Sequence, residues 1–330
     1  MSRETELPAP AIAPGESLPC WCEQSWDTLA VRAGNGTLPH ALLLGGPAGL
    51  GKRAFAEAFA RARLCARPRE GFACGECRAC RLLAAGTHPD RMLVTLEVNE
   101  KTGNLRREIV IEQIRALSER LAMASQFDGW QVAVIDPADA MNFAAQNALL
   151  KTLEEPTPSS LIVLIADQPW RLQATIRSRC QRIDFDVPPR NVAAAWLRTR
   201  GVDDPDAVLD AAGGNPGQAW LLIRDDGLQR RDEVARDLLA LARGRAQART
   251  IAKAWADDDP EARLAHAARL IAASLAARQE GVPASFDPGW DAAALLAGFD
   301  RANRVRDLLR GPLRADLALF DWLAGLPRGG

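Results

Sequence analysis

The sequence contains no tyrosine, and phenylalanine, tryptophan and tyrosine together make up only 5% of its 330 residues. A surface that stacks nucleic-acid bases needs aromatic side chains interleaved with basic ones, so this composition argues against such a platform. The 41 basic and 42 acidic side chains leave a formal net charge of −1. That balance excludes a global field that would draw the whole molecule onto nucleic acid or an anionic membrane. Any contact with DNA must be local.

A long hydrophobic run and an export signal are also missing. Residues 1–19 contain acidic residues and prolines where a signal peptide has a basic start and an apolar stretch. Apolar runs such as residues 161–166 are far shorter than the roughly 20 residues that a membrane helix requires. We therefore expect a cytoplasmic protein without a membrane segment.

Four short apolar runs, separated by helix-length segments, predict the strands of a parallel α/β sheet: residues 41–44, 92–96, 132–135 and 161–166. Each run is apolar at consecutive positions, as in strands covered on both faces. Beyond residue 186 only helix-like patterns appear. We predict three domains: an α/β domain over residues 1–186, a small helical lid over 187–226 and an all-helical domain over 227–330.

A phosphate-binding P-loop pattern, GPAGLGK, follows the first apolar run and precedes a helix-like segment. Its backbone N–H groups would face phosphate oxygens and its lysine would add a positive charge; the candidate nucleotide-binding residues are Gly46, Gly49, Gly51 and Lys52. A working site needs Ser or Thr next, to ligate magnesium, but this chain has Arg53. The pattern leaves open a degenerate nucleotide site and a glycine-rich turn that binds nothing.

Asp136 ends the third apolar run, where a Walker B aspartate would hold magnesium, and it completes the candidate nucleotide site. Hydrolysis needs a neighbouring carboxylate to orient or deprotonate water, and that position is Pro137. Asp139 is the nearest substitute, and we expect it to face solvent or cap the following helix. These departures favour a site that has lost catalysis.

Four of the seven cysteines form a C-x8-C-x2-C-x2-C pattern within one short segment: Cys65, Cys74, Cys77 and Cys80. This spacing suits a tetrahedral structural zinc site, with no position left for water or substrate. Buried thiols without metal and an iron–sulfur cluster are the alternatives. His88 could replace one ligand, but we expect it to be a hydrogen-bonded structural residue.

Ser178-Arg179-Cys180 alone is an ordinary surface pattern near a helix end. Together with the P-loop, the four cysteines, GTHPD at residues 86–90 and NALLKTLEEP at 147–156, it resembles the bacterial clamp-loader AAA+ family. The resemblance is most specific over about residues 38–186 and is weak after the lid. It implies an AAA+ α/β domain with an inserted zinc module at residues 65–80, a lid, and a C-terminal collar that forms oligomers.

Within that family, the motor subunits gamma and tau keep a P-loop Thr, a Walker B Glu and a sensor-2 Arg. The corresponding positions here are Arg53, Pro137 and Gly217, so the chain resembles the member that does not hydrolyse ATP. The resemblance implies that Arg179 is an arginine finger in the site of an adjacent motor subunit. It also implies partners: the motor subunits and delta within the DNA polymerase III holoenzyme, and, through the complex, the sliding clamp and primed DNA.

Two other functions remain open from the sequence. An active motor ATPase of the same fold is opposed by the residues at positions 53, 137 and 217. A zinc-bearing nucleic-acid-binding module would explain the arginines clustered around the cysteines, although it lacks the aromatic residues noted above.

Overall fold

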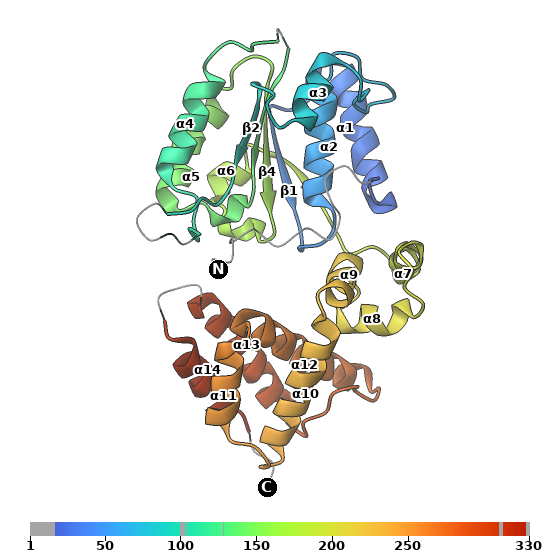
Figure 1. The fold of residues 1–330 in the computed structure, drawn as a ribbon, viewed down its shortest axis with the longest axis vertical. Helices are drawn as coiled ribbons and strands as arrows, with labels where there is room; N and C mark the ends of the chain where they lie inside the picture. The colour runs from blue at the N-terminus through green and yellow to red at the C-terminus, as the bar shows by residue number, and fades with distance from the viewer. Residues whose placement is uncertain (1–16, 100–102, 104, 128, 310–312, 328–330) are drawn as a thin grey trace. The chain divides into compact units, whose positions relative to one another are not determined.

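A fully parallel five-stranded sheet forms the centre of the N-terminal part of the chain (Figure 1). The computed structural model describes residues 17–99, 103, 105–127, 129–309 and 313–327. The strands lie in the order β2-β3-β4-β1-β5, and their bounds are Ala41–Gly45 (β1), Arg91–Val94 (β2), Gln131–Ile135 (β3), Ser160–Ala166 (β4) and Gln181–Asp184 (β5). The four predicted strands are confirmed, with ends displaced by one or two residues.

Strand β5 was not predicted. It lies at the edge of the sheet and pairs only with β1 among the described strands. Its sequence is polar at three of four positions, and only Ile183 is buried. An edge strand needs no apolar run, because one long side and much of its surface face solvent. The pattern that revealed the other four strands was therefore absent here.

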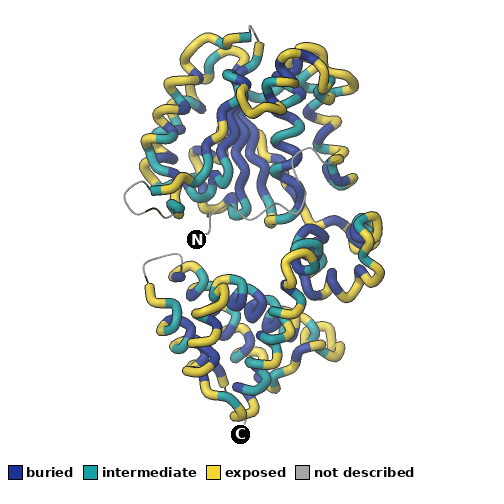
Figure 2. The backbone as a smooth tube through the Cα atoms, in the orientation of Figure 1, coloured by how far each residue is buried: buried dark blue, intermediate teal, exposed yellow. Residues whose placement is uncertain are grey.

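Helices cover both faces of this sheet, as the continuous apolar strands predicted. Along β1, Leu42 and Leu44 pack into one hydrophobic cluster, and Leu43 packs into the other. Figure 2 shows the sheet as the most deeply buried part of the N-terminal unit. The first cluster is completed by α1 (Glu23–Gly34), α2 (Lys52–Leu64) and α3 (Arg78–Ala84), and the second by α4 (Ile111–Leu121), α5 (Phe143–Glu154) and α6 (Ala174–Arg177).

Packed aromatic side chains connect α1 to α2 and to the loop that follows α2. Trp26 is 3% exposed, and its ring meets Phe55 and Phe59 edge-on at 5.5 and 5.7 Å. It also stacks on Phe72 at 4.3 Å. Each fully buried side chain of this size stabilises the fold by about 1.5–3 kcal/mol. This packing anchors the loop between α2 and α3, which carries three of the four clustered cysteines.

The chain divides into two compact units, residues 1–189 and 190–330, and the second is helical throughout its described residues. One hydrophobic cluster lies within its first three helices, α7 (Arg190–Thr199), α8 (Pro205–Ala211) and α9 (Pro216–Arg224). Another surrounds Trp255 and Trp322, which are fully buried with ring centroids 6.1 Å apart; it joins α10 (Gly227–Ala242), α11 (Ala248–Asp257), α12 (Pro260–Glu280), α13 (Ala292–Leu309) and α14 (Ala315–Ala324).

The predicted α/β domain followed by a helical region is confirmed, whereas the division of that region into a lid and a collar stays a prediction. Among the described helices, none has both the length and the apolar character needed to cross a bilayer.

Candidate functional site

The P-loop glycines adopt backbone conformations that other residues rarely take. Gly46, Gly49 and Gly51 have φ angles of 137°, 91° and 91°, in the region where a Cβ is strained. At Gly46 a Cβ would also lie 2.2 Å from the carbonyl oxygen of Phe185. The loop therefore runs from β1 directly into α2 in the position expected of a phosphate cradle.

Lys52, the first residue of α2, turns its side chain back into this loop. The side chain is only 3% exposed, and its Nζ lies 2.8 Å from Asp167 Oδ1. Nζ also donates to the carbonyl oxygens of Gly46 and Pro47, at 2.5 and 2.6 Å. The charge of the P-loop lysine is thus balanced within the chain.

Arg53 makes the second charged contact of the loop. Its Nε donates to Asp136 Oδ2 at 2.6 Å, and the Asp136 side chain is 15% exposed. Burial raises the pKa of Asp136, and the nearby Arg53 guanidinium opposes that rise. A guanidinium carries no lone pair for a metal, so Arg53 could not coordinate a magnesium ion in this loop.

Asp139 does not lie where we expected it. It belongs to a short 3₁₀ turn, Ala138–Ala140, and its Oδ2 accepts a hydrogen bond from the backbone N–H of Gln168 at 2.8 Å. Asn142, not Asp139, caps α5, by accepting from Ala145 N–H at 2.9 Å. Burial raises the pKa of Asp139, and its bond to Gln168 ties the end of β3 to the loop that follows β4.

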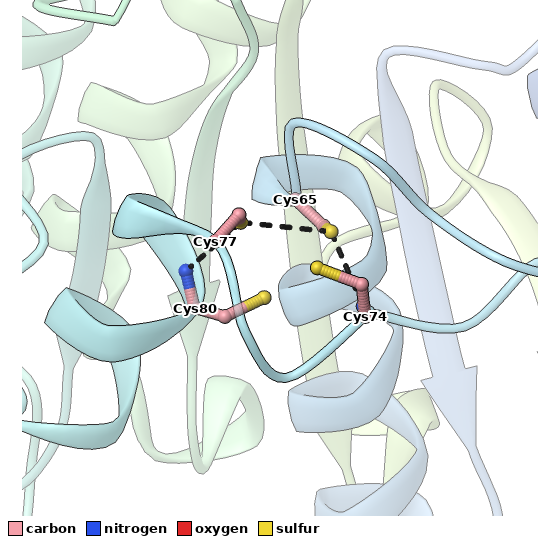
Figure 3. A group of neighbouring side chains, drawn as sticks. All are labelled: Cys65, Cys74, Cys77 and Cys80. Carbon is pink, nitrogen blue, oxygen red and sulfur yellow. Dashed lines mark hydrogen bonds between the residues drawn. The ribbon is translucent and has the colours of Figure 1, made fainter.

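The four cysteines converge at the end of α2 and the start of α3 (Figure 3). All four sulfur atoms lie within 4.8 Å of one another, and Cys65 Sγ is 3.9 Å from Cys77 Sγ. Four sulfurs bound tetrahedrally to one zinc at about 2.3 Å would be roughly 3.8 Å apart. The cluster is therefore shaped to hold one metal ion.

Backbone N–H groups point at two of these sulfurs. Cys65 Sγ accepts from Arg67 N–H at 3.4 Å and from Cys74 N–H at 3.3 Å, and Cys77 Sγ accepts from Cys80 N–H at 3.4 Å. Burial disfavours the Cys77 thiolate, but hydrogen bonds from the backbone and from the Cys80 and Cys74 side chains outweigh it and lower the pKa of Cys77 to about 6. Such bonds stabilise sulfur as the thiolate, which is the form that binds metal.

His88 is a structural residue, as predicted, and the four-cysteine cluster does not include it. Its ring is buried, accepts from Asp90 N–H at 3.2 Å and lies 4.8 Å from the ring of Phe127. Burial lowers the pKa of His88, so the neutral form is favoured.

Arg179 lies just after α6 and is held by two contacts. One terminal nitrogen, NH2, lies 2.7 Å from Glu154 Oε1, and the other, NH1, donates to the carbonyl oxygen of Thr175 at 2.9 Å. The Arg179 side chain is 36% exposed. The next residue, Cys180, is buried, and burial raises the pKa of its thiol to about 12. Cys180 thus anchors the chain while Arg179 remains accessible.

The sequence analysis did not predict the residues that contact Lys52 and Arg179, which are Asp167 and Glu154. Asp167 follows a buried strand at the carboxyl edge of the sheet, where ligand-binding residues of α/β proteins gather, so its position was a usable signal. Glu154 gave no comparable signal, because its contact joins the end of α5 to Arg179, which follows α6 and is distant in the sequence. Gly217, which the resemblance places at the sensor-2 position, is buried in α9 of the second unit.

Comparisons with known proteins agree with these motifs. The family described as DNA polymerase III, delta subunit, matches residues 21–189. The DNA polymerase III subunit delta' of Pseudomonas aeruginosa is 39% identical over 239 residues, which cover 71% of this chain and 70% of that protein. The Escherichia coli subunit delta' is 34% identical over 66% of this chain and 64% of that protein. The Bacillus subtilis subunit tau is 34% identical over 44% of this chain and 24% of that protein.

Proposed function

Because this chain belongs to the family of DNA polymerase III delta-prime subunits, we propose that it acts in clamp loading as a subunit that does not hydrolyse ATP. It works in the cytoplasm and joins gamma or tau motor subunits and delta in one complex. That complex places the sliding clamp on primed DNA. Its own contribution to hydrolysis is Arg179, which enters the ATP site of a neighbouring motor subunit.

The ion pair between Arg53 and Asp136, at 2.6 Å, is the observation that carries this proposal. In a working site the residue after the P-loop lysine and the Walker B aspartate hold magnesium between them. Here the two side chains satisfy each other. With Pro137 in place of a carboxylate, no side chain at that position can take a proton from water. This arrangement supports loss of hydrolysis and disfavours an active motor subunit.

The isolated chain should show no ATP hydrolysis above background. Lys52→Ala should change the DNA-dependent turnover of the assembled complex by less than about twofold, because the site already lacks a magnesium ligand and a catalytic carboxylate. Steady-state phosphate release measures both. The same change in the P-loop lysine of a motor subunit serves as the positive control. Turnover by the isolated chain that matches a motor subunit would contradict the proposal.

Membership of the complex is tested by reconstitution. Motor subunits and delta, mixed with clamp, primed DNA and ATP, should load the clamp only when this chain is added. Loading that is complete without it would overturn the proposed role.

The cysteine cluster adds a structural metal site to this proposal. Zinc fits the four sulfurs, since four protein ligands fill its tetrahedral shell and leave no position for water or substrate. The ion would fasten the loop between Cys65 and Cys80 to the end of α2. Its role is then to shape the surface of the module and not to take part in hydrolysis.

A further inference from the structure

The contact between Glu154 and Arg179 joins the end of α5 to the residues just after α6. The carboxylate and the guanidinium are 2.7 Å apart, and their side chains are 50% and 36% exposed. Exposed pairs of this kind contribute little to protein stability, because solvent screens the charges and two long side chains lose freedom. Stability of the fold is therefore a poor explanation for this pair.

The pair does restrict the position of the Arg179 guanidinium. Glu154 binds one terminal nitrogen of the guanidinium, and the carbonyl oxygen of Thr175 binds the other at 2.9 Å. These contacts hold both terminal nitrogens, and the side chain itself holds Nε, so together they restrict the orientation of the guanidinium plane. A guanidinium has five N–H donors, so three remain after these two bonds to meet another acceptor.

We propose that Glu154 is a positioning residue for Arg179. It holds the guanidinium in one orientation before the neighbouring ATP site is completed. An arginine side chain gives up considerable rotamer freedom when it is immobilised, and a group ordered in advance loses less of it in the transition state. This inference rests on the proposed finger role of Arg179. Glu154 itself need not touch nucleotide, because it acts through the arginine.

Glu154→Ala should lower the DNA-dependent turnover number of the assembled complex about fivefold, with KM for ATP changed less than about twofold, because the loss is one of orientation at the reacting phosphate. Glu154→Gln keeps an acceptor oxygen at the same place and should recover at least half of the lost rate. The matched control is Glu155→Ala. Glu155 is also exposed, directly follows Glu154 and forms no side-chain hydrogen bond or ion pair with another described residue, so this variant should behave as wild type.

The double variant Glu154→Ala/Arg179→Ala separates positioning from a general structural effect. If Glu154 acts only through Arg179, the double variant should be no slower than Arg179→Ala alone, since coupled residues are not additive. Further loss in the double variant would overturn the inference. So would a rise in turnover for Glu154→Ala, which would make the carboxylate a competitor of phosphate.

Arg179→Ala, measured in the same series, distinguishes failure of the positioning role of Glu154 from failure of the finger role of Arg179. If Arg179→Ala lowers turnover while Glu154→Ala does not, the positioning role of Glu154 is wrong and the finger stands. If Arg179→Ala has no effect, the finger role fails, and the inference fails with it. Size-exclusion chromatography should show an intact complex for every variant, because both side chains are substantially exposed in the chain.

Discussion

Replacing Arg179 with alanine should leave this chain folded and able to join its partners, yet sharply reduce DNA-dependent ATP hydrolysis by the assembled complex. An arginine finger contributes about 10³ to 10⁵ in rate at the site it serves. Loss of a surface side chain with one exposed ion pair changes stability by no more than about 1 kcal/mol. The measurement is steady-state hydrolysis by the reconstituted complex with clamp and primed DNA.

Arg179→Lys should recover little of the lost rate, because a compact ammonium cannot reproduce the planar fork that meets two phosphate oxygens. Arg177→Ala is the matched control, since Arg177 is also exposed and lies two residues earlier at the end of α6. If the proposed complex has several ATP sites, only one of them would lose its finger, so we expect total turnover to fall by less than the full factor. Wild-type turnover by an intact Arg179→Ala complex would refute the assignment.

Purified without chelator, the chain should carry about one zinc ion, as four thiolates in a closed tetrahedral shell bind one metal. The double variant Cys77→Ser/Cys80→Ser should lose nearly all of it. Elemental analysis measures the metal, and hydrogen exchange should show lost protection around residues 65–84, which include the cluster and α3. The sheet should keep its protection, because its hydrophobic clusters do not include the cysteine ligands.

Cys20→Ser is the control for this experiment, because Cys20 is exposed and lies outside the four-cysteine cluster. It should retain the full metal content. Iron in the purified protein, or zinc well below half an equivalent, would contradict the zinc assignment.

The sequence predicted the strands most clearly where every residue of the strand is buried. The strands that became β1, β3 and β4 are buried at every position, so composition alone marked them. Strand β5 has a single buried residue, Ile183, and left no such signal. Edge position, which removes the need for apolar residues, is a property of the assembled sheet and not of the local sequence.

In the candidate site, too, some features could be predicted from the sequence and others could not. The P-loop and the cysteine cluster are local patterns, so spacing was enough to predict them. The pairs that decide their chemistry join distant positions: Lys52 with Asp167, and Arg53 with Asp136. Sequence showed that Arg53 could not hold magnesium, but not that it would pair with Asp136 instead. Only the neighbouring carboxyl ends of the parallel strands bring those residues together.

Two ion pairs within the chain bear on whether the loop that contains Lys52 and Arg53 changes conformation when nucleotide is present. Lys52 and Arg53 are each matched by a carboxylate of the same chain, so the loop needs no bound nucleotide to balance its charges. A protein shifts between states only as far as a ligand binds one state better than the other. If the chain works as the non-hydrolysing subunit proposed above, we expect the loop from Gly46 to Arg53 to keep the same conformation with and without ATP.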